Sequence, residues 1–207
     1  MRGTFIVVDG RDGVGKTTLA RCLVRRLEAA GLEVVEVREP GGTPLAEAAR
    51  AAVLDPSLEA VPAAELFLIL AARADLVARV IEPALRTGKV VVADRFDLST
   101  EAYQVAGRGL AADAVTVANR LATGGLIPDL TLVLDAPDHE VRERRALQGK
   151  DPDRIERADA DVLGRVSRAF RDARGPGIVH LDASGTPEEV ESAAWEHVQA
   201  LLAGTPR

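Results

Sequence analysis

Several kinds of residue are scarce in this sequence, and each shortage excludes a class of protein. A single cysteine, Cys22, excludes an intramolecular disulfide. The net charge of −6 is opposite in sign to the footprint of a nucleic-acid-binding protein, so we expect no nucleic-acid partner. The N-terminal apolar run is too short for a signal peptide, and no run approaches the ~20 apolar residues of a membrane helix. We therefore expect no membrane association and a cytoplasmic location.

Lysine and aromatic side chains are also scarce, which narrows the candidates for a ligand site. The lysines are Lys16, Lys89 and Lys150, so arginine supplies nearly all of the positive charge. Arginine suits rigid, bidentate contacts with phosphate. Aromatic residues make up 3% of the chain, and Tyr103 is its only tyrosine. A ring that packs against a bound base or sugar would therefore have few possible sources.

The apolar residues that are present predict a parallel sheet. The 207 residues, 47% apolar and 28% charged, fit one domain spanning residues 1–207. Five short runs are nearly continuous in Val, Ile and Leu, which is typical of strands covered on both faces. These runs are Phe5–Val8, Val34–Val37, Val90–Ala93, Leu130–Leu134 and Ile178–Leu181.

Helical patterns alternate with these runs. They predict helices over Lys16–Ala30, Ala63–Arg86, Asp138–Leu147, Asp159–Ala173 and Pro187–Leu202, with a possible kink at Pro83. The alternation predicts an α/β fold: a five-stranded parallel sheet with helices on both faces. Ligands of such sheets bind beyond the carboxyl ends of the strands, where polar residues recur in this chain.

The strongest motif follows the first predicted strand. Residues 10–17 match G-x-x-x-x-G-K-[ST] at every fixed position, between a strand and a helix. Free N–H groups of such a loop bind phosphates, Lys16 reaches the β- and γ-phosphates, and Thr17 can ligate Mg²⁺. The alternative is a glycine-rich turn that merely starts a helix. The motif predicts ATP binding by Gly10, Arg11, Asp12, Gly13, Val14, Gly15, Lys16, Thr17 and Thr18.

Other stretches resemble the thymidylate kinase family nearly end to end. They are VVDGRDGVGKTT (7–18), VREPGGTPLAE (37–47), LILAARADLV (68–77), DRFDLSTEAYQ (94–104), PDLTLVLD (128–135) and DPDRIE (151–156). The resemblance implies a P-loop nucleoside monophosphate kinase-like fold. It also implies transfer of the terminal phosphoryl group of ATP to dTMP with Mg²⁺, and a homodimer formed by helix packing. ATP and dTMP are then the two small-molecule substrates.

The resemblance also implies residues that hold the acceptor. Arg95 binds the acceptor phosphate, Asp94 organises the magnesium shell with Thr17, and Asp12 meets the 3′-hydroxyl. Tyr103 packs beneath the deoxyribose and leaves no room for a 2′-hydroxyl. The implied dTMP-binding set is Asp12, Arg38, Pro40, Ile69, Arg73, Arg95, Ser99, Tyr103 and Gln104. Each has a plainer alternative: a surface ion pair for Arg95, a solvated helix position for Arg73 and core packing for Tyr103.

The resemblance further implies an arginine-bearing lid over residues 142–156. Its positive residues are Arg142, Arg144, Arg145, Lys150 and Arg154. Family members that lack an arginine at the third variable P-loop position supply one from the lid. Gly13 holds that position here, which fits the lid-supplied type. We expect Arg145 and Arg154 to contact ATP and the catalytic set to be Lys16, Arg95, Asp12 and Arg154. The alternative is a solvated, charged helix face.

One position departs from the family pattern. The family commonly has phenylalanine four residues before the base-reading arginine, on the same helix face, and this chain has Ile69. Either Ile69 packs on the base without stacking, or Phe67 or Phe96 compensates. Three other functions remain as alternatives: a kinase for another small acceptor, a nucleotide-dependent switch, and a binding protein that has lost catalysis.

Overall fold

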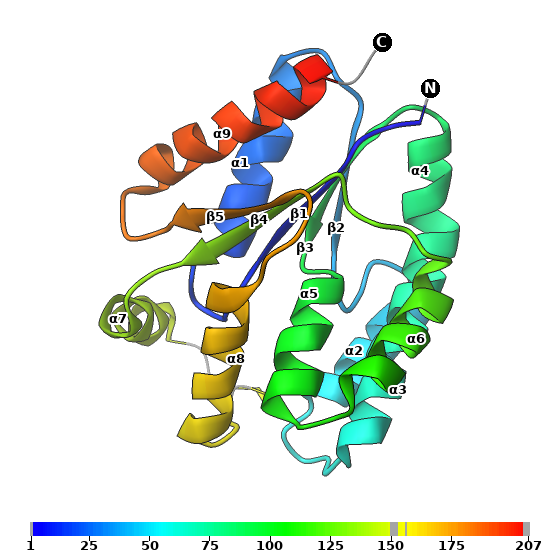
Figure 1. The fold of residues 1–207 in the computed structure, drawn as a ribbon, viewed down its shortest axis with the longest axis vertical. Coiled ribbons are helices and arrows are strands. Elements are labelled where there is room, and N and C mark those ends of the chain that lie inside the picture. Colours follow the sequence, from blue (N-terminus) through cyan, green and yellow to red (C-terminus); the bar gives the residue numbers. More distant parts are fainter. Residues whose placement is uncertain (1, 150–152, 156, 205–207) are drawn as a thin grey trace.

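The computed structural model describes residues 2–149, 153–155 and 157–204 (Figure 1). Its sheet confirms the five predicted strands, and all of them run parallel in the order β2-β3-β1-β4-β5. The strands are β1 (Phe5–Gly10), β2 (Val34–Arg38), β3 (Val90–Asp94), β4 (Leu130–Asp135) and β5 (Ile178–Asp182). Each strand extends one or two residues beyond its apolar run, so each carries a polar residue or glycine to the same edge.

The two faces of the sheet are buried by different helices. On one face, α1 (Lys16–Ala29) and α9 (Pro187–Gly204) share an apolar core with β1, β3 and β4. On the other face, the core joins β1 and β3 to the helices that follow β2. There the rings of Phe5 and Phe96 meet edge to face at 5.0 Å. Both faces are therefore covered, as the continuous apolar runs predict.

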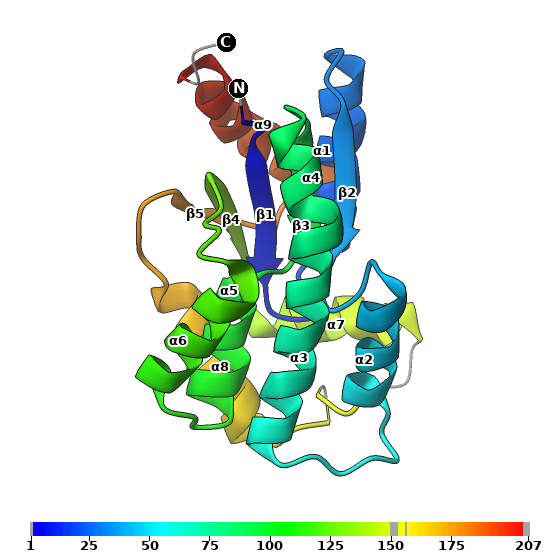
Figure 2. The same ribbon diagram turned by 90° about the vertical axis from the view of Figure 1, so that its right-hand side faces the viewer.

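The helix predicted over Ala63–Arg86 is interrupted ahead of its proline. It consists of α3 (Pro62–Leu76), a π-helical turn η1 (Val77–Ile81) and α4 (Glu82–Arg86). Pro83 has no N–H to donate, and the wider turn before it accommodates that loss. Figure 2 shows α3 and α4 stacked end to end, with α4 beside the strands and α3 extending beyond their carboxyl ends. The predicted bend is thus a change of helix type over one turn.

Three helical segments lie where no helix was predicted, and two of them are long single α-helices. These two are α2 (Pro44–Leu54), whose first turn is capped by Thr43 accepting from Ala46 N at 3.1 Å, and α6 (Ala112–Thr123). The third is α5 (Asp97–Thr100) with η2 (Glu101–Gly107), and the rest of the helical layer is α7 (Asp138–Gln148) and α8 (Ala160–Asp172). The predicted helices corresponding to α7, α8, α1 and α9 are confirmed to within two residues at each end. Within the described ranges, no helix has the length and apolar character needed to span a bilayer.

Candidate active site

The loop after β1 has the geometry of a phosphate-binding loop. Gly10, Gly13 and Gly15 have φ values of 138°, 83° and 107°, which side chains rarely adopt. Gly15 precedes the first turn of α1, whose N–H groups have no partners within the helix. The loop therefore opens directly onto a helix N-terminus, the setting in which backbone N–H groups bind phosphate.

Lys16 and Thr17 lie at the mouth of this loop. The Lys16 ammonium donates to the Arg11 carbonyl at 2.8 Å and lies 3.8 Å from the Asp12 carboxylate. Burial lowers the pKa of Lys16, and the nearby Arg95 lowers it further. The Thr17 hydroxyl donates to the Asp94 carboxylate at the end of β3. Both predicted metal ligands are thus adjacent, and their hard oxygen atoms are of the type that Mg²⁺ binds together with substrate phosphates.

Arg95 is the centre of the polar network. It follows β3 with φ 74°, and it is the one described non-glycine residue with positive φ. Its guanidinium donates to the Gly10 carbonyl at 3.1 Å and to the Ser99 hydroxyl at 2.9 Å. It also forms an ion pair with Asp12, whose other oxygen accepts from the Tyr103 hydroxyl at 2.6 Å. Three predicted residues, Asp12, Arg95 and Tyr103, therefore form one cluster between two loops.

Asp9 anchors this cluster from beneath, and sequence reasoning gave it no role. Its carboxylate is fully buried and accepts from Gly10 N, Ser99 N and the Ser99 hydroxyl. Burial raises the pKa of Asp9, and Arg95, 3.6 Å away, opposes that shift. The sequence feature that could have identified Asp9 is its position, since it is a charged residue that directly follows a fully apolar strand. Asp9 locks the first turn of α5 to the phosphate loop.

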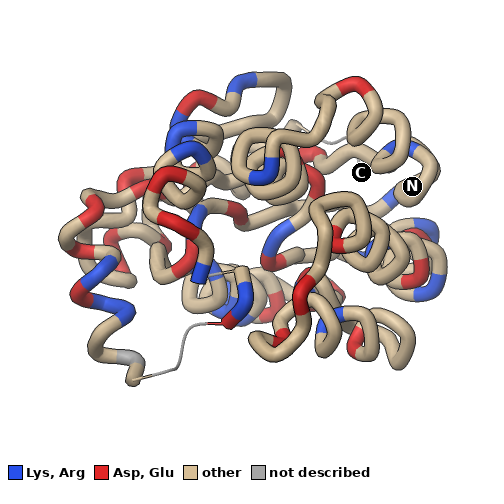
Figure 3. The backbone as a smooth tube through the Cα atoms, turned by 90° about the horizontal axis from the view of Figure 1, so that it is seen from below, with Lys and Arg blue, Asp and Glu red and all other residues tan. Residues whose placement is uncertain are grey.

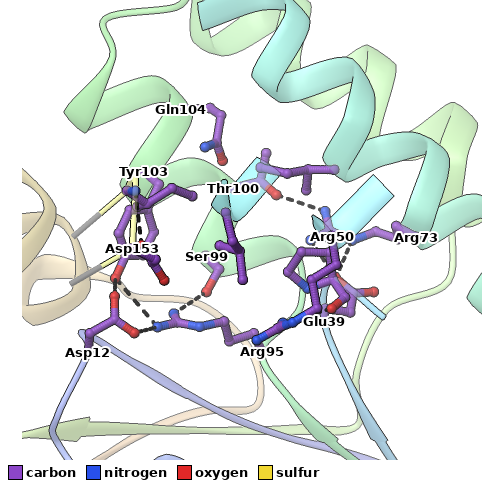
Figure 4. A pocket seen from close by; sticks show the side chains of 14 residues that line it. Asp12, Glu39, Arg50, Arg73, Arg95, Ser99, Thr100, Tyr103, Gln104 and Asp153 are labelled. Atoms are coloured by element: carbon purple, nitrogen blue, oxygen red, sulfur yellow. Dashed lines mark hydrogen bonds and ion pairs between the residues drawn. The ribbon is translucent and has the colours of Figure 1, made fainter. Parts of the chain in front are cut away.

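The predicted acceptor residues line a single cavity, with one exception. Figure 4 shows this cavity from close by. Its walls include Asp12, Pro40, Ile69, Arg73, Arg95, Ser99, Tyr103 and Gln104. They come from the P-loop, the turn after β2, α3, α5 and η2, segments far apart in the sequence. The carboxyl end of the sheet brings them together, as parallel strands require.

Arg38 is the exception, and Arg50 lies in the cavity instead. The Arg38 side chain is 48% exposed and is paired with Glu47 at 3.0 Å. Arg50, on α2, lines the cavity and donates to the Pro40 carbonyl at 2.8 Å. Burial lowers the pKa of Arg50, and the neighbouring charges of Arg38 and Arg95 lower it further. Three guanidinium groups, those of Arg50, Arg73 and Arg95, thus border one cavity.

Arg73 lines the cavity with its donors already engaged. Its side chain is 1% exposed and bonds Glu39 at 2.7 Å, Thr100 at 2.8 Å and the Phe96 carbonyl at 2.9 Å. Its Nη1 also contacts Asn119. Arg73 therefore supplies fixed positive charge at this wall. Its reading of a base edge stays a prediction.

The choice among the three apolar candidates for the base is narrowed by their positions. Ile69 lines the cavity, together with Ile155 from the lid. Phe67 is 64% exposed on the opposite side of α3, and Phe96 is fully buried against Phe5. Neither phenylalanine reaches the cavity, so Ile69 is the residue of the three that can pack on a base there.

A second pocket lies on the other side of the P-loop. It is bordered by Gly13, Gly15, Thr18 and Arg144, and by the loop after β5. Arg144 donates to the Ala183 carbonyl of that loop at 2.7 Å. Arg11 points elsewhere, to the loop between β4 and α7, where it bonds the Ala136 carbonyl and Asp138.

The two lid arginines predicted to contact ATP lie in different places. Arg145 packs over the P-loop, because a Cβ added to Gly13 would be 2.5 Å from its Cγ. Arg154 instead docks on the acceptor side, where it bonds Glu65 at 2.8 Å and the Val53 carbonyl at 2.8 Å. Lys150 and residues 151, 152 and 156 of the predicted lid lie outside the described residues.

Charges of both signs surround the carboxyl edge of the sheet. Figure 3, which views the molecule from that edge, shows acidic and basic segments interspersed over the face. The ion pairs Arg95–Asp12 and Arg38–Glu47 follow the same pattern. Local groups of arginine and lysine, rather than the net charge, therefore create the phosphate-binding regions.

A P-loop at the end of the central strand, opposed by an arginine-bordered cavity, defines the class of P-loop nucleoside monophosphate kinase-like proteins. A family model described as thymidylate kinase matches residues 8–194. The chain is also 46% identical to a thymidylate kinase of Cereibacter sphaeroides, over 99% of this chain and 98% of that protein. Thymidylate kinases of Pelotomaculum thermopropionicum and Deinococcus radiodurans are 44% and 42% identical, over 93% and 95% of this chain and 96% and 97% of theirs. The chain belongs to the thymidylate kinase family.

Proposed function

We propose that this chain transfers the γ-phosphoryl group of ATP to dTMP, giving dTDP and ADP, as a step in dTTP synthesis. The observation that carries this proposal is the pair of guanidinium groups, Arg50 and Arg95, that border one cavity beside the P-loop. Guanidinium groups suit rigid, bidentate contacts with phosphate oxygens. A monophosphate in that position would face the γ-phosphate held by the P-loop.

The chemistry requires positioning more than proton transfer. An oxygen of the acceptor phosphate attacks the γ-phosphorus while the bond to the β,γ-bridging oxygen of ATP breaks, and ADP leaves. The acceptor phosphate is already ionised, so no strong base is needed. Lys16 and Arg95 stabilise the charge that spreads over the transferred group. Thr17 and Asp94 would hold Mg²⁺, which would supply neutralisation of charge on the phosphates of ATP.

The remaining cavity residues fit a deoxynucleoside. Tyr103 is fixed by its bond to Asp12 at 2.6 Å, so its ring is a rigid wall for the sugar. Asp12 has acceptor capacity for the 3′-hydroxyl. Ile69 and Arg73 border the base region together with Gln104. The P-loop, Thr18 and Arg145 hold ATP, with Arg154 reaching it only if it leaves Glu65.

The organisation of the whole chain is proposed on the same basis. Residues 1–207 form one domain with a lid over roughly residues 142–156. The protein acts in the cytoplasm and forms a homodimer through helix packing. The support for pairing is the outer face of α6, where Val117 and Leu121 are 71% and 85% exposed.

Matched arginine variants test the acceptor site. Arg50→Gln removes a charge that lines the cavity, and we expect the KM for dTMP to rise about 10- to 100-fold, the range of a lost charge-assisted hydrogen bond. Arg38→Gln removes a charge from the same region that is paired with Glu47 outside the cavity. It should change the KM less than about threefold. Steady-state ADP release at saturating ATP measures both.

The two variants can contradict the proposal in different ways. Equal effects of both substitutions would mean that the charge of the region, not the cavity, binds the acceptor. A normal KM for dTMP in Arg50→Gln, with a large rise in Arg38→Gln, would mean that Arg38, the residue predicted from sequence, binds the acceptor phosphate. In both variants the KM for ATP is measured as well, so that a change specific to dTMP can be told from a general loss of binding.

A further inference from the structure

A buried carboxylate, Glu65, lies behind the base end of the cavity. It belongs to the first turns of α3, and its side chain is 1% exposed. It does not line the cavity itself. An unpaired charge so deeply buried would be strongly destabilising, so its partners show what it does.

Four hydrogen bonds and ion contacts satisfy Glu65, from three residues on two separate segments. Its Oε1 accepts from Gln104 Nε2 at 2.9 Å and from Arg108 Nε at 3.1 Å. Its Oε2 accepts from Arg108 Nη2 at 3.0 Å and pairs with Arg154 Nη1 at 2.8 Å. The carboxylate therefore joins α3 to η2, to the turn after η2 and to the lid.

These partners keep Glu65 ionised. Burial alone would raise its pKa, but the hydrogen bonds from Arg108 and Gln104 and the charges of Arg108 and Arg154 outweigh burial, so the pKa is lowered. An ionised carboxylate has no hydrogen and can only accept. Turning the Gln104 amide so that Oε1 faced Glu65 would therefore place two acceptors in contact. The orientation with Nε2 toward Glu65 is the favourable one.

The fixed amide determines what Gln104 offers to the cavity. Gln104 is 1% exposed and borders the cavity, which its side chain enters from η2 (Figure 4). With Nε2 committed to Glu65, the free atom is the carbonyl oxygen Oε1. Among the described residues, none donates a hydrogen bond to it. The cavity thus contains an acceptor that cannot rotate into a donor.

We propose that Glu65 is a positioning residue that sets base specificity by holding the Gln104 carbonyl toward the acceptor base. The base of dTMP has a single hydrogen-bond donor, N3–H, flanked by two carbonyl oxygens. Cytosine has an acceptor at N3, which a fixed carbonyl repels. The site therefore accepts thymine and rejects cytosine, because cytosine bound there would leave the buried Gln104 carbonyl without a donor at N3.

The Gln104 carbonyl cannot distinguish between bases that share the N3–H donor. Uracil also carries N3–H, so the Glu65–Gln104 pair treats dTMP and dUMP alike, and discrimination of the methyl group belongs to apolar contacts. This inference rests on the proposed transfer to dTMP. It predicts a change in one substrate ratio and constancy in another, which loss of stability alone would not produce.

Glu65→Gln tests the proposal because it keeps the shape of the side chain and adds an N–H₂ group. The new donor can bond the Gln104 carbonyl, so the amide can turn and offer Nε2 to the cavity. We expect the ratio of kcat/KM for dTMP to that for dCMP to fall about tenfold or more. The ratio of kcat/KM for dTMP to that for dUMP should stay within about twofold of its value in the unmodified protein, since both bases carry the same N3–H.

Arg108→Gln is the matched control. It removes two bonds to Glu65 but leaves a carboxylate facing Gln104, so melting temperature should fall while the dTMP-to-dCMP ratio is kept. If Glu65→Gln does not fold, Gln104→Leu replaces it, with the same fall in that ratio expected. An unchanged ratio in the variant measured, or an equal change in Arg108→Gln, would overturn this proposal alone. No turnover of dTMP by the unmodified protein would overturn the proposed function as well.

Discussion

Arg95 has a strained backbone conformation that the site requires. A non-glycine residue at φ 74° is strained by roughly 1–3 kcal/mol, and such residues cluster at functional sites. The strain is tolerated because the residue is held at several points. Its N–H donates to the Val8 carbonyl at 3.0 Å, and its guanidinium bonds Gly10, Ser99 and Asp12. The left-handed turn directs the guanidinium back over the P-loop.

Gly13 allows a residue-scale test of the lid. A Cβ at this position would meet Arg145, whereas Gly31, with nearly the same φ of 82°, has open space around it. Gly13→Ala and Gly31→Ala should both lose about 1–2 kcal/mol through left-handed strain, a fall in melting temperature of about 2–8 °C. Only Gly13→Ala should displace Arg145, and we expect its kcat/KM for ATP to fall at least about tenfold.

The comparison of the two alanine variants separates strain from displacement. Calorimetric melting gives the common stability loss, and steady-state kinetics at varied ATP gives the specific one. A similar loss of kcat/KM in both variants would mean that Arg145 is not needed over the P-loop, and that backbone strain accounts for the effect.

At the scale of elements, the sequence predicted what local pattern determines. The strands and α1 follow from continuous apolar runs and from the fixed spacing of the P-loop. Helices α2 and α6 were missed: α2 is rich in alanine, which gives a weak amphipathic signal, and α6 follows a glycine-containing turn. Missing α2 hid Arg50, which lies four residues after the buried Ala46 and three before the buried Val53. A helical pattern there would have placed Arg50 on the buried face.

The paired roles of buried charges could not be predicted, because they depend on contacts between distant segments. Glu65 and Gln104 are 39 residues apart, and Glu65 and Arg154 are separated by more than twice that distance in the chain. Nothing in the local pattern of either segment specifies the pairing. Likewise, the docking of Arg154 away from the P-loop follows from the position of Glu65, which sequence reasoning gave no role.

The outer face of α6 is the surface through which we expect two chains to form a dimer. Its inner face packs Val115 against α3, while Val117 and Leu121, one turn apart, point outward and are largely exposed. Apolar exposure of neighbouring side chains marks an interaction surface. We expect light scattering to give twice the mass of one chain for the unmodified protein.

The matching variant introduces charge into that face. Leu121→Glu should yield monomers, because a dimer would bury an unpaired carboxylate. Gln199→Glu, an exposed position on α9 on the other side of the sheet, serves as the control and should remain dimeric. A monomeric unmodified protein, or a dimer that persists in Leu121→Glu, would exclude this surface as the interface.

At the scale of the whole molecule, the sheet is the device that assembles the site. In the register of the strands, Asp94 lies opposite both Val8 and Arg38, which brings the ends of β1, β2 and β3 level. The P-loop, the turn after β2 and the start of α5 therefore meet at one edge. This arrangement is what makes a two-substrate reaction possible, since each substrate needs its own loop.

The most direct test of the account is the rate of ADP release with ATP, Mg²⁺ and a panel of nucleoside monophosphates. The panel contains dTMP, dUMP, UMP, dCMP, AMP and GMP, each at the same concentration. The account predicts strong turnover with dTMP, weaker turnover with dUMP and little with the ribonucleotides, because Tyr103 fills the space of a 2′-hydroxyl. Binding of ATP without turnover of dTMP, or equal turnover of dUMP and UMP, would contradict it.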